Sequence, residues 1–277
     1  LEFRRVLFRS KTYASAKSIL DLVQRGCRIA VMSHSHKAIN NLLIEVAKRA
    51  REAGTRIQIA KKVSKPEDVP EDPSIISTSK NDDPVLMTAS VVGGTVWLFA
   101  RPEFAGAFSH IFVDEAGQVS IANLMASSGC ARNIVLVGDQ MQLPQPIQGV
   151  HPGETALSTL EYLLGDQHAV AADRGIFLPV SRRMHPDVCG VVSRLAYDGR
   201  LKSDENAARQ AILFPHGGLP SSGVAFVDVA HVDNSQESQE EADAVCATFT
   251  RLLNASFIDR EGVERKMTVD DILVVSP

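Results

Sequence analysis

The sequence predicts an α/β protein built on a parallel β-sheet. Two short apolar runs near the middle of the chain, Ile111–Val113 and Ile134–Val137, are each followed closely by an acid. Runs of this length between polar residues are typical of strands that are buried on both faces of a parallel sheet. Segments with helical spacing alternate with such runs; residues 13–24, for example, repeat their apolar residues on one helical face until Gly26.

The other elements follow from the same two patterns. Helical spacing predicts helices at 13–24, 39–50, 152–164, 187–197 and 239–253. Short apolar runs predict further strands at 28–32, 55–60, 85–90, 94–100, 176–180, 224–229 and 272–275, the last of them buried.

Polar side chains follow the two central runs. The carboxyl ends of parallel strands meet at one edge of a sheet, which is where such sheets bind ligands. We expect five side chains to gather at that edge: Asp114, Glu115, Asp139, Gln140 and Gln142. Asp114 would hold Mg²⁺, directly or through water, and Glu115 would orient and deprotonate an attacking water. The alternative is that the two adjacent acids begin a helix, where acids are favoured; the polar end of the second run favours the chemical site.

Three motifs resemble those of superfamily 1 helicases, in the branch of the RNA-surveillance and Okazaki-nuclease helicases. Asp114-Glu-Ala-Gly-Gln resembles the Walker B motif, Gly138-Asp-Gln-Met-Gln-Leu-Pro the next motif, and Ser181-Arg-Arg-Met-His-Pro the motif that opens the second motor domain. The resemblance is spread over residues 11–277 in the family's order. It implies a RecA-like P-loop NTPase that uses ATP and Mg²⁺ to move along single-stranded nucleic acid, with DNA expected rather than RNA.

This resemblance divides the chain. Residues 1–10 read as a non-native, adapter-like segment, with a natural basic arm as the alternative. Residues 11–172 are expected to form the first RecA-like motor domain, with a small surface insertion at 61–84, and 173–277 part of a second one. The chain is therefore expected to be a fragment, truncated at both ends and inactive as an ATPase by itself.

The pair Lys11-Thr12 resembles the end of a G-x-x-x-x-G-K-T phosphate loop. In such a loop the Lys neutralises phosphate oxygens and the Thr hydroxyl binds Mg²⁺. Ser10 precedes the pair and no glycine is nearby, so the tight turns of the loop are not expected to form here.

The resemblance also implies a nucleotide role for residues beyond this pair. Arg183 would reach the γ-phosphate from the second domain. Gln142 would sense the same phosphate, with Asp139 and Gln140 in the same cluster.

Two stretches occupy the places where relatives touch the nucleic-acid backbone. The candidate contacts are Ser33, His34, Ser35, His36, Asn40, Asn41, Gly94 and Thr95. Hydroxyls, amides and imidazoles at a helix start grip phosphates without reading sequence. Helix capping by Ser33 or Ser35 is the alternative, and metal binding by the histidines lacks a third ligand. Trp97 is expected in the core, with stacking on a base as the alternative.

Bulk composition fits a soluble, cytoplasmic enzyme. The chain is 44% hydrophobic and 22% charged, and it has no apolar run of membrane-spanning length and no secretory signal. A net charge of -4 does not indicate a nucleic-acid binder, although a motor can confine its basic residues to one groove. The four cysteines are widely spaced, which favours reduced, mostly buried thiols over a structural zinc.

Two other functions remain open. One is a nucleic-acid-binding module without turnover, and the other is a different P-loop phosphotransferase such as a nucleotide kinase. The stretches at His151–Gly153 and Arg174 resemble bacterial members in which the motor follows a RecB-like nuclease domain, so a covalently linked nuclease is an expected partner in the full-length protein. No nuclease residues occur in this chain, and no membrane partner is expected.

Overall fold

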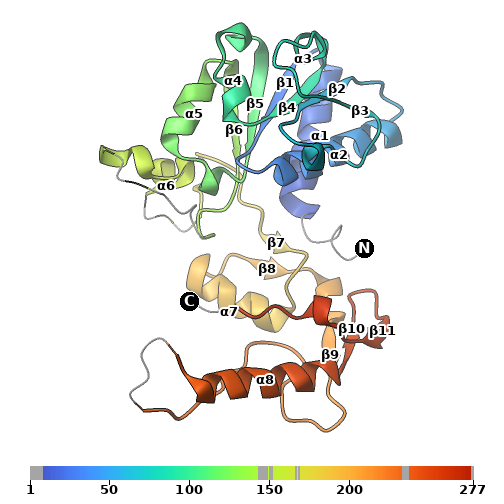
Figure 1. Ribbon diagram of the computed structural model, residues 1–277, viewed down its shortest axis with the longest axis vertical. Coiled ribbons are helices and arrows are strands. Elements are labelled where there is room, and N and C mark those ends of the chain that lie inside the picture. The colour runs from blue at the N-terminus through green and yellow to red at the C-terminus, as the bar shows by residue number, and fades with distance from the viewer. Residues whose placement is uncertain are drawn as a thin grey trace. The chain divides into compact units, whose positions relative to one another are not determined.

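The computed structural model describes residues 9–142, 149, 152–165, 167, 169–232 and 237–275. The chain divides into two compact units, shown in Figure 1. The first unit ends at Phe177 and the second begins at Leu178, near the boundary expected at 172.

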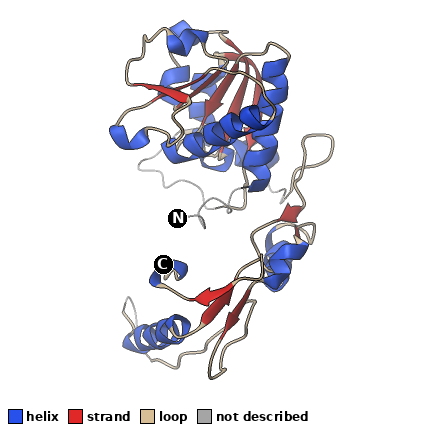
Figure 2. Cartoon of the chain, turned by 90° about the vertical axis from the view of Figure 1, so that its right-hand side faces the viewer, coloured by secondary structure: helices blue, strands red, loops and turns tan. Residues whose placement is uncertain are grey.

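A six-stranded parallel sheet forms the centre of the first unit, in the order β3-β2-β4-β1-β5-β6. The strands are β1 (Ile29–Met32), β2 (Ile59–Lys62), β3 (Ile75–Thr78), β4 (Val91–Gly94), β5 (Phe108–Asp114) and β6 (Ala131–Val137). The helices are α1 (Arg9–Gln24), α2 (His36–Glu52), α3 (Val85–Thr88), α4 (Val96–Phe99), α5 (Ile121–Ser128) and α6 (Thr159–Leu164). Helices lie on both faces of the sheet (Figures 1 and 2), so the predicted α/β fold with a parallel sheet is confirmed.

Alternation along the strands divides the core into two layers. In β1, Ile29 and Val31 pack with apolar residues of α1 and α2 on one face of the sheet. Ala30 and Met32 point to the other face and pack with residues of α3, α4 and α5. Successive side chains of a strand point to opposite faces, so a short run of four apolar residues supplies both layers.

Arg28 fastens the amino ends of three strands. Its guanidinium donates hydrogen bonds to the main-chain oxygens of Ala89 (3.0 Å), Ala107 (3.1 Å) and Leu86, and it lies 4.4 Å from the centre of the Phe108 ring. The three oxygens belong to segments that lead into or lie just before β4 and β5. Because all of its hydrogen bonds go to main-chain oxygens of the fold, Arg28 is a structural residue.

The segment 61–84 departs from the expected surface insertion. Lys61 lies in β2 and is fully buried, and β3 (Ile75–Thr78) pairs with β2 as the edge strand. A backbone segment with a sheet neighbour can satisfy its polar groups inside the fold. Only the stretches around these strands, including the short 3₁₀ turn Pro66–Asp68, lie at the surface in the way expected.

The strands predicted at 85–90 and 94–100 are also wrong. Val85–Thr88 and Val96–Phe99 are short helices, and the strand between them is β4. The side chain of Asp83 accepts a hydrogen bond from the main-chain N–H of Val85 at 3.0 Å, which starts the first of these helices. Both apolar runs are so short that their periodicity does not distinguish a strand from a single helical turn.

Two further expectations near the end of the first unit need correction. Among the described residues β6 pairs with β5 alone; Ile134 is 42% exposed, so the strand is not buried on both faces. The single helix predicted at 152–164 is instead a 3₁₀ turn (Gly153–Ala156) followed by α6, which Ser158 caps together with Glu161.

The second unit contains a smaller amount of regular structure. Its helices are α7 (Pro186–Ala196) and α8 (Gln239–Leu253), and its strands are β7 (Val180–Ser181), β8 (Lys202–Ser203), β9 (Ala211–Leu213), β10 (Ser256–Ile258) and β11 (Glu264–Lys266). β7 pairs with β8 in parallel, and β9, β10 and β11 form an antiparallel sheet. The helix predicted at 239–253 is confirmed in full, and the one at 187–197 agrees to within a residue at each end.

The strands predicted at 224–229 and 272–275 do not form. Within the described ranges neither segment pairs with a strand, and Phe226 and Leu273 are 92% and 86% exposed. Of the strand predicted at 176–180, only Val180 belongs to a strand, the short β7. A strand requires a neighbour to hydrogen bond with, and the sequence pattern alone does not supply that neighbour.

Two findings concern membranes and cysteines. None of the helices in the described ranges has the length and apolar character needed to cross a bilayer. All four cysteines are free; Cys130 and Cys189 are buried, Cys27 is half-buried and Cys246 is exposed.

Candidate active site

The buried carboxylate of Asp114 lies at the carboxyl edge of the sheet. It ends β5, its side chain is 7% exposed, and its oxygen accepts a hydrogen bond from the main-chain N–H of Glu115 at 3.1 Å. Burial and then the neighbouring charge of Glu115 raise the pKa of Asp114 to about 6, while the charge of Lys11 acts to lower it. The fold therefore brings Lys11 and Asp114, far apart in the chain, within electrostatic reach of each other.

Lys11 and Thr12 lie inside the first turn of α1 and do not open it, because this helix already begins at Arg9. Thr12 is buried and Lys11 is half-buried. Residues 1–8, where the phosphate loop would lie, are outside the described residues. The pair is thus placed near the acidic edge, and the loop that would precede it is not described.

Glu115 has a backbone conformation that is unusual for a residue other than glycine. Its φ of 56° and ψ of 43° place it in the left-handed region, directly before the 3₁₀ turn Ala116–Gln118. Such conformations cost free energy and concentrate at functional sites. The charge of Glu115 lies close enough to Asp114 to contribute to the raised pKa of that carboxyl group.

Two glycines allow the Walker B-like turn to touch the following motif. A Cβ atom added to Gly117 would lie 2.6 Å from the main-chain oxygen of Asp139. A Cβ atom added to Gly138 would lie 2.9 Å from the main-chain nitrogen of Ala116. Only glycine permits backbones to approach this closely. The two motifs are therefore packed against each other, main chain to main chain.

The turn after β6 organises the remaining polar residues of the site. Asp139 accepts a hydrogen bond from the main-chain N–H of Met141 at 3.1 Å, and the Gln142 amide lies 3.4 Å from the other oxygen of Asp139. The side-chain oxygen of Gln140 is buried and has no hydrogen-bond partner. Leu143, Pro144 and the rest of this motif, and also His151, lie outside the described residues.

These donors suit a Mg²⁺ ion held together with a triphosphate. Among the described residues no group of three or more acids, histidines and cysteines forms a self-sufficient metal site. Mg²⁺ in nucleotide enzymes is typically held by one or two protein oxygens, with phosphates and waters as the other ligands. Asp114 with the buried Thr12 hydroxyl matches that donor set, and the unpartnered Gln140 oxygen faces an environment that supplies no donor.

The candidate nucleic-acid residues gather at the same edge of the sheet. Met32 at the end of β1 is in register with Gly94 at the end of β4, so Ser33 and Thr95 follow adjacent strands. Ser35 caps α2 by accepting a hydrogen bond from the N–H of Lys37 at 3.2 Å, as the capping alternative predicted.

Individual candidates differ in how accessible they are. Ser33 is 1% exposed, whereas His34 is exposed and Asn41 is half-buried. The amide of Asn40 donates to the main-chain oxygen of Asp68 at 3.1 Å and also accepts from Lys61, so it serves the fold. Gly94 sits where a Cβ atom would lie 2.6 Å from Leu98, which gives this glycine a packing reason as well.

Trp97 and Arg183 are the two remaining residues for which the sequence predicts a place. Trp97 is 81% exposed, so the expectation that it lies in the core is wrong; its place in the one-turn helix α4 leaves the ring at the surface. Arg183 is an exposed residue of the second unit, two residues before His185, which caps α7. Its approach to the nucleotide site stays a prediction.

Lys61 is a functional candidate that the motifs do not predict. Lys61-Lys62 begins a polar stretch, which is typical of a surface insertion. The signal that identifies it is the two-residue period: Ile59, Lys61 and Val63 alternate with their neighbours and all three are buried. A lysine on the apolar face of a strand requires hydrogen-bonding partners inside the fold.

Comparisons with known proteins agree with this geometry. A family model described as an AAA domain matches residues 32–148, and a second, also described as an AAA domain, matches residues 157–277. The DNA replication ATP-dependent helicase/nuclease DNA2 of Gallus gallus is 27% identical over 64% of this chain and 18% of its own length. The protein of the same name in Schizosaccharomyces pombe is 25% identical over 82% of this chain and 17% of its own length.

A third relative has a different name. The putative helicase mov-10-B.1 of Danio rerio is 30% identical over 62% of this chain and 19% of its own length. The chain thus spans less than a fifth of the length of the relatives it matches. The two family matches, the motifs in their order and the parallel sheet of the first unit agree: the chain belongs to the superfamily 1 helicases, in their Dna2-like branch.

Proposed function

We propose that the intact protein hydrolyses ATP and uses this reaction to move along a single strand of nucleic acid, DNA rather than RNA. The observation that carries this proposal is the carboxyl edge of the first unit, where the buried Asp114 and the charge of Lys11 interact. The names of the DNA2 relatives support DNA as the substrate and a nuclease domain elsewhere in the full-length protein. The free cysteines support a cytoplasmic location.

The chain's own residues would divide the work as follows. Lys11 would bind phosphate oxygens, and Thr12 with Asp114 would hold Mg²⁺, which supplies charge neutralisation for the triphosphate when bound. Glu115, next to the metal ligand, would orient the attacking water and accept its proton. Asp139 and Gln140 would line the same cluster.

Two residues would link the nucleotide to movement. Gln142, tied to Asp139 in the turn after β6, would respond to the γ-phosphate. Arg183 would reach that phosphate from the second unit. The strand would run over Ser33–His36, Asn41 and Gly94-Thr95, with hydroxyl, amide and imidazole groups facing its phosphates.

The test is a matched pair of substitutions in the intact protein. Glu115→Gln removes the proposed base and keeps the shape of the side chain, so ATP hydrolysis stimulated by single strands should stop while nucleotide binding persists. Glu103→Gln, at an exposed acid paired with Arg101, is the control and should leave hydrolysis unchanged. Retained turnover in Glu115→Gln would refute the assigned base.

The same assay separates the alternatives. The phosphate transfer of a nucleotide kinase would not respond to single-stranded nucleic acid, whereas the ATP hydrolysis of a motor is stimulated by it. The 277-residue chain by itself is expected to bind strands without turnover, which is also the behaviour of a simple binding module.

A further inference from the structure

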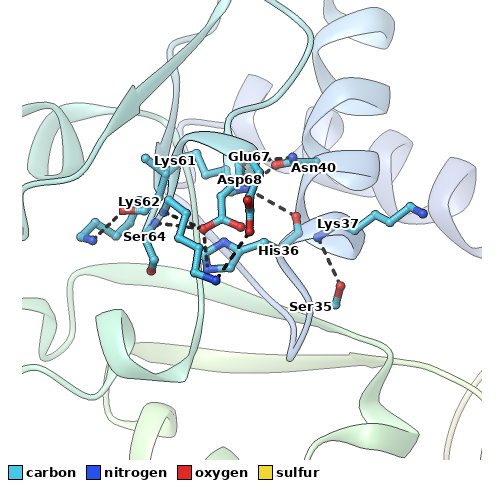
Figure 3. Close-up of polar contacts among 11 residues, drawn as sticks. Ser35, His36, Lys37, Asn40, Lys61, Lys62, Ser64, Glu67 and Asp68 are labelled. Carbon is cyan, nitrogen blue, oxygen red and sulfur yellow. Dashed lines mark hydrogen bonds and ion pairs between the residues drawn. The ribbon is translucent and has the colours of Figure 1, made fainter.

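Two cations, the half-buried Arg28 and the fully buried Lys61, hold opposite edges of the sheet in the first unit. Arg28 fastens the amino edge, as described above. Lys61 does the equivalent at the carboxyl edge: it is the third residue of β2, it is fully buried, and its amino group donates to three acceptors (Figure 3). These are the side-chain oxygen of Asn40 and the main-chain oxygens of Asp68 and, at 3.4 Å, His36.

The acceptors come from two different segments. Asn40 and His36 belong to the first turns of α2, and Asp68 belongs to the 3₁₀ turn that follows β2. The Asp68 carboxylate in turn accepts hydrogen bonds from the main-chain N–H groups of Ser64 (3.1 Å) and Lys65 (2.9 Å) and lies 3.5 Å from Nε2 of His36. Lys61 is therefore the centre of a network that joins the start of α2 to the turn after β2.

The start of α2 is also the segment that carries candidate nucleic-acid contacts. His34 and Ser35 are exposed there, directly before His36, whose main-chain oxygen Lys61 holds from inside the fold. Because Lys61 is fully buried, its side chain does not reach a bound nucleic-acid strand. Its hydrogen bonds reach the backbone and side chain of the helix start that carries these exposed side chains.

An apolar residue would fill this position at lower cost. Burial lowers the pKa of Lys61 to about 8, with the charge of Asp68 opposing that effect, so the folded protein works against the charged form. Ile59 and Val63 occupy the same face of this stretch as ordinary core residues. A buried charge replaced by apolar residues is often neutral or stabilising. The presence of a charged residue at this position is thus explained by its three hydrogen bonds, which join the start of α2 to the turn after β2.

We propose that Lys61 is a positioning residue for single-strand binding, which fixes the start of α2 against the turn after β2 without touching the strand. This inference rests on the proposed function, because it concerns the same nucleic-acid surface. A positioning residue and a direct phosphate contact differ in their salt dependence: each lost phosphate contact reduces the slope of log affinity against log salt by about one.

The experiment measures binding of a fluorescent single-stranded DNA oligonucleotide to the 277-residue chain by anisotropy, over a series of NaCl concentrations at pH 7. Lys61→Met should weaken binding on the order of tenfold, because the exposed side chains at the start of α2 are displaced, and should leave the salt slope unchanged. Lys37→Met, at an exposed lysine in the first turn of α2, should instead reduce the slope. Arg28→Met removes the half-buried cation at the amino edge and should lower thermal stability without changing affinity.

A second variant keeps the test decisive if Lys61→Met does not fold. Asp68→Ala removes a negative charge near the strand, which by charge alone would strengthen binding of a polyanion. The positioning role predicts weaker binding, because the turn after β2 loses its hydrogen bonds. The inference about Lys61, but not the proposed binding surface, would be overturned by any of three results. These are unchanged binding by Lys61→Met, a reduced salt slope in that variant, or tighter binding by Asp68→Ala. Failure of the unaltered chain to bind any strand would overturn both the inference and the proposed binding surface.

Discussion

Replacing Asp114 by asparagine should make the protein more stable at neutral pH. The carboxyl group is 7% exposed, and burial followed by the charge of Glu115 raises its pKa to about 6. Asparagine keeps an oxygen to accept the hydrogen bond from the Glu115 N–H at 3.1 Å and removes the buried charge. The substitution thus tests one physical quantity, the cost of an ionised carboxylate at this position.

The magnitude follows from linkage. The ordinary pKa of an aspartate is 3.8 and that of folded Asp114 is about 6. At about 1.36 kcal/mol per pH unit, ionisation at neutral pH destabilises the fold by about 3 kcal/mol. The sign is that of a raised carboxyl pKa: stability is lost as pH rises from 3.8 to 6, and no cost exists below 3.8. For a unit of this size, about 3 kcal/mol corresponds to roughly 6–12 °C in Tm.

The assay is thermal unfolding of the 277-residue chain and the variant at pH 4 and pH 7.5. Asp114→Asn should unfold at a clearly higher temperature at pH 7.5, and the difference should nearly vanish at pH 4. Asp72→Asn is the matched control in the same unit. Burial alone would raise the pKa of Asp72, but hydrogen bonds from Ser74 and the Arg51 guanidinium at 2.8 Å outweigh it and lower the pKa, so this variant should be less stable at pH 7.5.

A lower Tm for Asp114→Asn at pH 7.5 would refute the reasoning, and so would an equal increase at both pH values. The first result would mean that the carboxylate is stabilised by partners inside the fold. The second would mean that packing, and not ionisation, sets the difference. Either outcome would remove the main argument that this edge is prepared for a cation.

Two further predictions concern backbone packing and the second unit. Gly117→Ala places a Cβ atom 2.6 Å from the oxygen of Asp139, so it should lower the free energy of unfolding by about 1–3 kcal/mol, as overpacking does, measured by urea titration; unchanged stability would show that the two turns separate easily. Asp271→Asn should destabilise the second unit by about 1 kcal/mol at pH 7, since two 2.7 Å bonds from Arg265 hold the pKa of Asp271 well below its usual range. That loss should shrink as pH falls below 3.8, and a loss as large at pH 2 as at pH 7 would point to another cause.

The sequence was most informative where pattern and length agreed. The helices at 39–50 and 239–253 carry long runs of helical spacing and clear caps, at Ser35 and Ser238, and both formed as predicted. Short apolar runs were ambiguous, since four residues such as Val96–Phe99 suit one helical turn as well as a strand. Their state depends on neighbours distant in the chain, which a local pattern does not contain.

For the candidate site, the motifs predicted which residues would share an edge, and the fold placed Asp114, Glu115 and Asp139 there. What sequence alone did not reveal is how that edge is held. The close approach at Gly117 is visible only once β5 and β6 are paired. The role of Lys61 depends on three acceptors, and two of them are main-chain oxygens that carry no sequence signal.

The two edges of the sheet differ in a way that identifies the ligand edge without reference to motifs. At the amino edge, Arg28 satisfies three main-chain oxygens. At the carboxyl edge, burial raises the pKa of Asp114 and so disfavours its ionised form. Glu115 has a left-handed backbone conformation, and the side-chain oxygen of Gln140 has no hydrogen-bond partner. Each of these features costs free energy in the isolated chain, and a cation with a bound polyanion would offset at least the buried charge. A fold selected only for stability has no reason to concentrate such costs on one edge, so their concentration supports a nucleotide site there independently of the family resemblance.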